Sequence, residues 1–265
     1  MTPGAAIPYP ARIVFKSLFI FTLVAGAGCG GDVPILMYHS VATSGDPLTV
    51  SPVQLDEQLD YLSRGGFTTV SVKDLLDAQD GHGSLPEHPI VLTFDDGFAE
   101  HYSTVLPLLQ KRKQKATFFI VSGWTSNDPA HRKLDPQVHR PHLIWSEVRA
   151  LRDAGMEIGS HTVTHGSLVD LKPAEQRVEL EQSKADLERE LKMPIDIFAY
   201  PFTRQKIRVR QAVQRAGYRA ALVGPRGGAD RLELQRITIR GSVSLSDFRG
   251  LLGESWATGY TTGGG

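Results

Sequence analysis

The sequence predicts an α/β protein whose strands form a barrel of seven or eight β/α units. Short apolar runs alternate with amphipathic helical stretches throughout residues 33–253, and no linker or internal repeat interrupts the series. Such alternation requires crossover connections and therefore a parallel sheet. At least seven units of this kind favour a closed barrel over an open sheet, so we expect one domain with helices around the strands.

The individual strands and helices are predicted from the spacing of apolar residues and from the residue types at the ends of each segment. Strands are predicted from short β-branched and aromatic runs at 33–39, 67–72, 89–94, 116–121, 156–161, 195–201, 219–224 and 236–241. Helices are predicted from apolar residues at helical spacing at 51–66, 73–79, 100–113, 145–155, 173–192, 207–217 and 244–253. Ser51 is a plausible N-cap and Pro52 suits the first helical position. The connection at 122–142 is long, and such loops usually serve function or move.

Composition limits the class of partner. The 265 residues are 41% hydrophobic, which is enough for a sizeable core. Lysine plus arginine and aspartate plus glutamate number 29 each, so the formal net charge is zero. This balance provides no basic field for a nucleic acid, and we expect a monomer that binds none.

The N-terminus reads as an export signal. Arg12 and Lys16 precede the apolar stretch "SLFIFTLVAGAGCGG", which is short for a membrane span. Cys29 is the single cysteine, and "AGAGC" resembles a bacterial lipoprotein processing site. We therefore expect a signal at 1–31, a folded domain at 32–255 and a flexible tail at 256–265. Lipidation of Cys29 would give a cell-envelope lipoprotein, at the outer membrane or in the periplasm. Ordinary secretion, a retained anchor and no export are the alternatives.

Polar residues follow four of the predicted strands. They are His39, the pair Asp95–Asp96, the histidines of "SHTVTH" (His161 and His165), and Tyr200, Pro201 and Phe202. In barrels of this kind the active site lies at the carboxyl ends of the strands. The two carboxylates that end the apolar run "IVLTF" would therefore face a shared cleft and not the core.

The histidine pair suggests a metal site. Two histidines at i and i+4 lie on one side of a helical turn, where both imidazoles can reach one ion. A carboxylate from Asp95–Asp96 would complete a three-ligand catalytic pattern, and the second carboxylate could serve as a general base. Chance surface histidines and a turn or helix cap at "DDG" are the plain alternatives.

Other aromatic and histidine residues have weaker signals. Trp124 or Trp145 could stack on a sugar ring, although tryptophan more often belongs to a core. Without metal-ligand spacing, the remaining histidines are expected in loops or at the surface; they are His82, His88, His101, His131, His139 and His142. His139 and His142 would edge the cleft, because they lie on the long loop.

These residues resemble the signature motifs of a known family. "TFDDG", "SHTVTH" and "FAYPF" are similar, in this order, to the motifs of NodB-homology polysaccharide deacetylases, the carbohydrate esterases of family four. The likeness covers nearly all of 33–250. It implies a distorted barrel of seven or eight β/α units. It also implies a hydrolase that removes N-acetyl groups from an N-acetylhexosamine polysaccharide.

The resemblance also implies residue roles. Asp96, His161 and His165 would bind a divalent metal, typically zinc, with nickel, cobalt or iron as other ions that suit the ligands. Asp95 would be the catalytic base. The motif of Tyr200, Pro201 and Phe202 would form one wall of the substrate groove, and the Phe202 backbone N–H would stabilise the oxyanion.

The sequence departs from the family pattern at two points. Many members carry an arginine that orients the base where Ala199 stands, and Arg204 and Arg208 are the nearby substitutes. Many members also place the acid histidine late in the chain, whereas no histidine follows His165 here. His39 is early instead. This arrangement resembles the subgroup that deacetylates poly-β-1,6-N-acetylglucosamine in biofilms, and it implies that His39 is the catalytic acid.

Several functions compete with this one. Peptidoglycan, chitin oligomers or another exopolysaccharide could be the substrate. A glycosidase needs its two carboxylates about 5–9.5 Å apart across the scissile bond, and adjacent residues on one turn do not suit that. A non-catalytic carbohydrate-binding protein would not need the full set of His39, Asp95, Asp96, His161 and His165.

Overall fold

A computed structural model describes residues 33–43, 45–228 and 230–253. The chain divides into two units, 1–32 and 33–265, and the second contains every described residue. The expected signal, Cys29 and the tail at 256–265 lie outside the described residues. Within the described part of the chain, no helix is both long and apolar enough to cross a membrane.

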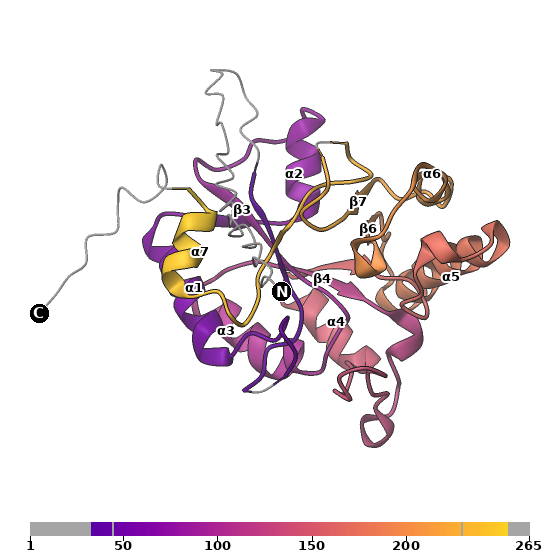
Figure 1. The fold of residues 1–265 in the computed structure, drawn as a ribbon, viewed down its shortest axis with the longest axis horizontal. Helices are drawn as coiled ribbons and strands as arrows, with labels where there is room; N and C mark the ends of the chain where they lie inside the picture. Colours follow the sequence, from indigo (N-terminus) through magenta and orange to yellow (C-terminus); the bar gives the residue numbers. More distant parts are fainter. Residues whose placement is uncertain (1–32, 44, 229, 254–265) are drawn as a thin grey trace, which may run out of the picture. The chain divides into compact units, whose positions relative to one another are not determined.

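The core of the second unit is a parallel sheet of eight strands, drawn as arrows in Figure 1. Their order is β7-β6-β5-β4-β3-β1-β8, and β2 pairs with β3 off this path. The strands are β1 (Ile35–Tyr38), β2 (Thr68–Val70), β3 (Pro89–Phe94), β4 (Thr117–Ile120), β5 (Glu157–Ser160), β6 (Ile197–Ala199), β7 (Ala220–Leu222) and β8 (Ile237–Thr238). The sheet curls as the predicted α/β barrel requires, which confirms the fold class.

An irregular segment joins the two ends of this sheet. Leu234 forms a parallel bridge with Leu222 of β7, and the chain then enters β8, which pairs with β1. Only Ile237–Thr238 of the expected strand at 236–241 is regular. Arg236 therefore lies in the segment where the barrel closes.

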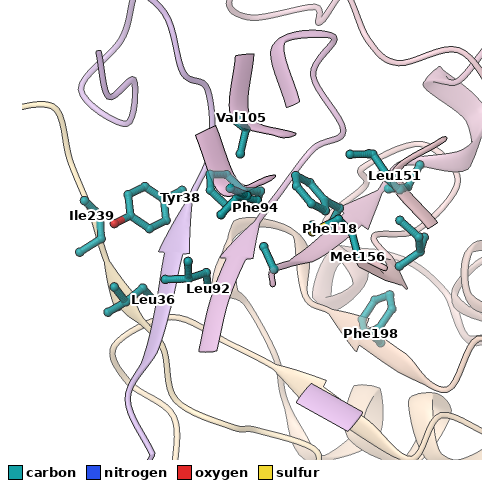
Figure 2. Packing of buried hydrophobic residues seen from close by; sticks show 14 of the residues in the cluster. Leu36, Tyr38, Leu92, Phe94, Val105, Phe118, Leu151, Met156, Phe198 and Ile239 are labelled. Carbon is teal, nitrogen blue, oxygen red and sulfur yellow. The ribbon is translucent and has the colours of Figure 1, made fainter. Parts of the chain in front are cut away.

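Alternation along the strands separates two faces. Leu36, Tyr38, Phe94 and Phe118 belong to the large cluster that packs against the helices, which we call the outer face. Figure 2 shows Tyr38, Phe94 and Phe118 side by side; the Tyr38–Phe94 and Phe94–Phe118 ring centroids are 5.1 and 5.2 Å apart. The residues between them along each strand face the opposite way, because side chains alternate with period two.

The inner face holds the smaller cluster. Ile35, Val91, Phe119, Ile197 and Ala199 pack there. Continuing the same alternation, His39 follows Ile35 and Met37, Asp95 follows Val91 and Thr93, and His161 follows Gly159. The alternation therefore directs these polar side chains toward the interior of the barrel, just beyond the strand ends.

The helices surround the strands (Figure 1). They are α1 (Pro52–Arg64), α2 (Val72–Gln79), α3 (Leu106–Lys111), α4 (Trp145–Asp153), α5 (Pro173–Leu191), α6 (Ile207–Arg215) and α7 (Leu245–Leu251). Helix α2 packs its buried residues Val72, Leu75 and Leu76 in the smaller cluster. Helix α1 contacts α3 and α7, whereas α5 contacts α4 and α6. The predicted helix at 100–113 is real but starts as a π-helical turn, His101–Val105. Ser51 caps α1 as expected, since its hydroxyl accepts a hydrogen bond from the Gln54 N–H at 3.1 Å.

Candidate metal centre and active site

The turn after β3 separates the two carboxylates. Asp95 continues the strand on its inner face, whereas Asp96 adopts a left-handed backbone with φ of 75° and Gly97 follows at 72°. A left-handed aspartate is uncommon, and such strain clusters at functional sites. The turn gives the adjacent side chains different directions and different partners.

Asp96 faces two imidazoles. Its Oδ1 lies 3.4 Å from His161 Nε2 and 3.3 Å from His165 Nε2. All three ligand atoms lie within 4.8 Å of one another. Burial acts against ionisation of Asp96, but His161, His165 and His39 hold its pKa well below the ordinary range. The site therefore presents an ionised carboxylate and two imidazole nitrogens to one point.

This donor set fits a divalent cation. Asp96 Oδ1 is buried and has no hydrogen-bond partner among the described residues, as expected of an atom reserved for a ligand. Tetrahedral ligands at about 2.0–2.1 Å from zinc lie about 3.3 Å from each other, close to the distances found here. His161 Nδ1 lies 2.8 Å from the Ala199 carbonyl oxygen, so Nδ1–H donates and Nε2 keeps a lone pair for an ion.

His161 and His165 come together as predicted, but not on the helical turn that their spacing suggested. Residues 161–165 are not a helical turn; they form a loop in which Thr162 and His165 have φ of 68° and 58°. The Thr162 hydroxyl accepts the His165 N–H at 2.9 Å. The carboxylate of Glu179 on α5 accepts the N–H groups of Val163 and Thr164 at 2.8 and 2.9 Å. Hydrogen bonds, and not helical periodicity, bring the two imidazoles together.

Asp95 is held by Arg236, a residue that the sequence reading missed. Arg236 is fully buried, and its Nη1 and Nη2 donate to Asp95 Oδ1 and Oδ2 at 2.7 and 2.8 Å. Its Nε donates to the Val223 carbonyl, and Nη1 also reaches the Thr93 hydroxyl. Burial opposes ionisation of Asp95, but the charge of Arg236 holds the pKa below its ordinary value. Asp95 is thus a fixed, ionised carboxylate.

The suggested substitutes for the missing arginine are engaged elsewhere. Arg204 pairs with Asp170 at the surface, and Arg208 donates to the Val169 carbonyl. The one available signal for Arg236 was a charged residue at the entry to an apolar strand, "RITIRG". It lies 141 positions from Asp95, so local spacing could not connect the two residues.

His39 directly follows β1 at the aspartate turn, since the Asp95 N–H donates to the carbonyl of the preceding residue, Tyr38, at 2.9 Å. It is half-buried. The next residue, Ser40, donates its hydroxyl proton to Glu100 Oε1 at 2.8 Å. The strand end that carries His39 is therefore tied to the segment that follows the aspartate turn.

The third motif contributes one exposed side chain. Phe202 is 46% exposed, has φ of 56°, and its ring centroid lies 4.6 Å from that of His165. Pro201 is buried, and the buried Tyr200 donates its hydroxyl proton to the Leu232 carbonyl, so neither side chain lines a groove. Trp145 is buried in the core, which excludes it as a sugar platform. Trp124 is half-buried, with its ring 5.3 Å from His165.

Two histidines that were expected in loops or at the surface are buried in this region. His101 is fully buried, and its Nε2 donates to the His39 carbonyl at 2.9 Å. His142 is 1% exposed, and its Nδ1 lies 3.1 Å from the Asp96 carbonyl oxygen. His142 does lie on the long loop, as expected, but both imidazoles are buried. His101 packs on the ring of Phe118 and His142 on the ring of Trp124, contacts that spacing in the sequence does not reveal.

Fold and site together define an α/β barrel whose strand ends carry an aspartate and two histidines that could hold a metal ion. A family model described as "Polysaccharide deacetylase" matches residues 82–221, which is 140 of the 265 residues. The chain therefore belongs to the polysaccharide deacetylase family and is a polysaccharide N-deacetylase.

Curated relatives agree with this assignment. A putative polysaccharide deacetylase of Bacillus subtilis, YxkH, is 29% identical over 222 residues, which cover 82% of this chain and 74% of that protein. The poly-beta-1,6-N-acetyl-D-glucosamine N-deacetylase of Escherichia coli is 34% identical over 120 residues. That match covers 43% of this chain but only 18% of the longer relative.

Solved structures share the fold. The Streptococcus pyogenes deacetylase PplD, in complex with acetate, has a TM-score of 0.74 at 25% identity, over 83% of this chain and 97% of that one. IcaB from Ammonifex degensii has a TM-score of 0.71 at 24% identity, over 86% and 97% of the two chains. The second likeness supports the barrel fold alone.

Proposed function

We propose that this protein is a metal-dependent hydrolase that removes N-acetyl groups from poly-β-1,6-N-acetylglucosamine. One observation carries the chemistry: three metal-type ligand atoms within 4.8 Å of one another lie beside a carboxylate that Arg236 holds ionised. The substrate is supported by the early position of His39 and by the sequence likeness to the Escherichia coli enzyme that acts on this polymer.

The metal ligands would be Asp96, His161 and His165. A divalent cation held there, zinc in this proposal, would polarise the acetamide carbonyl and make water a stronger acid. The His161 tautomer suits this role, because its Nδ1–H is committed to the Ala199 carbonyl. Nickel, cobalt and iron suit the same ligands, and the availability of each metal in the cell would decide which one binds.

Asp95 would act as the general base. It takes a proton from the attacking water as the oxygen bonds to the carbonyl carbon, and the two bonds from Arg236 keep the carboxylate ionised and fixed in direction. The tetrahedral oxyanion would be stabilised by the backbone N–H of Phe202, next to His165. One such donor is worth about 3–4 kcal/mol in transition-state stabilisation.

His39 would act as the general acid. Its position at the end of β1, near both carboxylates, suits proton donation to the leaving sugar amine. The products are acetate and a glucosamine residue. Trp124 and Phe202, which both contact the His165 ring, would form an aromatic border for a sugar.

The decisive assay measures acetate release from β-1,6-linked and β-1,4-linked N-acetylglucosamine oligomers, by zinc-loaded and by chelator-treated protein. Zinc-dependent release with preference for the β-1,6 linkage is expected. Preference for β-1,4 oligomers would replace the substrate with chitin-like or peptidoglycan-like polymers. No release together with no bound metal would favour a carbohydrate-binding protein.

The proposed location is the cell envelope, by export and lipidation of Cys29. The sequence "AGAGC" supports it. Cell fractionation with a Cys29→Ala variant tests it: the wild type should sediment with membranes and the variant should not. Equal soluble amounts of both proteins would indicate ordinary secretion.

A further inference from the structure

The long loop at 122–142 ends on a buried imidazole behind the metal site. His142 is 1% exposed; its Nδ1 lies 3.1 Å from the Asp96 carbonyl oxygen and 3.3 Å from that of Gly97. Carbonyl oxygens only accept, so Nδ1 carries the proton and donates to both.

The two carbonyls belong to the strained part of the turn. Asp96 and Gly97 have φ of 75° and 72°, and a non-glycine residue in this region is stable only when its surroundings hold it. The ring of His142 also stacks on Phe98, with centroids 5.2 Å apart and planes at 15°. The imidazole therefore fixes the turn by hydrogen bonds at its edge and by packing on its face.

The same ring supports a second ligand. Trp124 contacts the imidazoles of both His142 and His165, at centroid distances of 4.8 and 5.3 Å. The His142 side chain thus contacts Asp96 directly, by a hydrogen bond to its carbonyl oxygen. It reaches His165 indirectly, because Trp124 contacts both imidazoles. Residues that contact metal ligands, without binding the metal themselves, orient those ligands. Loss of such a residue typically weakens metal binding about 10–100-fold.

The loop and the turn are also joined along the backbone. His142 N–H donates to the Lys133 carbonyl at 2.9 Å, and Leu143 N–H donates to the Gly97 carbonyl at 2.9 Å. Arg132 Nη1 donates to the His142 carbonyl at 3.0 Å. The Ala99 N–H also donates to the Pro141 carbonyl at 2.8 Å, so the end of the loop is joined to the aspartate turn through His142 and the residues on either side of it.

We propose that His142 is a positioning residue that couples the order of the loop at 122–142 to the affinity of the metal site. The inference rests on the proposed metal site and adds the loop to it. Because linkage is reciprocal, a loop that supports the ligands must itself be stabilised when the ion binds.

The test compares zinc dissociation constants, measured by competition with a chelating dye, for the full-length protein and three variants. His142→Phe keeps a flat ring for Phe98 and Trp124 but removes the donor, and should weaken zinc binding about 10–100-fold. His142→Asn places an amide N–H near the former Nδ1–H and should recover affinity. His101→Phe is the matched control, a buried histidine bonded to the His39 carbonyl, and should leave zinc affinity near wild type.

Wild-type affinity in His142→Phe would overturn the proposal. If that variant does not fold, hydrogen exchange on the wild type decides: zinc should slow exchange of the His142 and Asp135 amides, which bond to the Lys133 and Arg140 carbonyls. Unchanged exchange would contradict the coupling. Neither readout needs substrate, so a wild type that binds zinc but releases no acetate would refute only the proposed activity. A wild type that binds no zinc would refute the metal site itself.

Discussion

Asp95 and Asp96 are neighbours in the chain but belong to regions of different construction. Asp96 faces His161 and His165 at 3.4 and 3.3 Å, with its Oδ1 free of hydrogen bonds among the described residues. Asp95 accepts two bonds from a buried arginine at 2.7 and 2.8 Å. The first carboxylate is left open for a ligand. The second is paired and held in place, with a lone pair still available on each oxygen.

The two regions also draw on different parts of the chain. The proposed metal ligands come from the ends of β3 and β5, next to Glu179 and His142. The base side depends on the irregular segment that closes the barrel, where Arg236 lies. Two adjacent carboxylates can therefore have separate tasks when different residues contact them, Arg236 in the case of Asp95 and two histidines in the case of Asp96. Changes on one side should leave the other largely intact.

Removing the arginine should have the largest effect on stability. Arg236→Met leaves the buried Asp95 carboxylate unpaired, which should lower the free energy of unfolding by about 3–5 kcal/mol at neutral pH. Chemical denaturation measures it. Asp95, with its lowered pKa, contributes stability above its unfolded pKa that is lost as pH falls through the folded value. The deficit of the variant should therefore shrink at acid pH.

Activity of an Arg236 variant sharpens the same point. Arg236→Lys keeps the positive charge but cannot bond both Asp95 oxygens at once, so this variant should be more stable than Arg236→Met but less stable than the wild type. The pKa of Asp95 should rise in it, because the carboxylate loses a hydrogen bond. The acid limb of the kcat/KM profile should therefore move to higher pH. Zinc affinity should change little. A large loss of zinc binding would show that the two sides are not separate.

Metal binding should weaken at acid pH through His161. Burial acts to lower the pKa of His161, but the carboxylates of Asp96 and Asp95 raise it above its ordinary value. Protons therefore compete with the ion as pH falls below that raised value, and affinity should fall by about tenfold per pH unit there. Isothermal titration in buffers of different ionisation enthalpy should show proton release near pH 7. No release would contradict a protonated His161.

The aromatic border should have a smaller effect. Phe202→Ala removes a half-exposed ring but keeps the backbone N–H, so kcat/KM should fall only about three- to tenfold, mainly through KM. Phe202→Tyr keeps the ring and should match the wild type. Steady-state kinetics on short oligomers measure both, and a thousandfold loss of kcat in the alanine variant would mean that the ring, and not the N–H, serves the reaction.

A surface arginine provides the smallest expected change. Arg204 pairs with Asp170, and both side chains are more than half exposed. Such exposed pairs contribute little to stability, because water and salt screen them. Arg204→Gln should leave stability and kcat/KM near wild type, in contrast to Arg236. A loss as large as that of the Arg236 variants would restore Arg204 as the orienting arginine.

Sequence patterns predicted most of the scaffold, because hydrophobic period and boundary residues act locally. The strand at 89–94 matches β3, and the carboxylates at its end lie where alternation places them. Part of the helix at 100–113 was less regular, since the chain leaves the aspartate turn through a π-helical turn. Element positions were thus predictable to within a few residues, whereas local distortion next to the site was not.

The residues behind the site escaped the sequence reading for a different reason. Arg236 is 141 positions from Asp95 and His142 is 46 from Asp96, so only the closed barrel brings each to its partner. The loop at 161–165 depends on Glu179 from α5, a contact that the spacing of its histidines does not encode. Sequence motifs identified the candidate ligands, but the residues that orient them could be identified only from the tertiary structure.

The central claim, that the adjacent carboxylates have separate tasks, is tested most directly by comparing Asp95→Asn with Asp96→Asn. Bound zinc and acetate release are measured on the same preparations. We predict that Asp95→Asn binds zinc as the wild type does and loses several orders of magnitude in turnover, whereas Asp96→Asn loses zinc and activity together. Equal loss of zinc in both variants, or substantial turnover by Asp95→Asn, would contradict the claim.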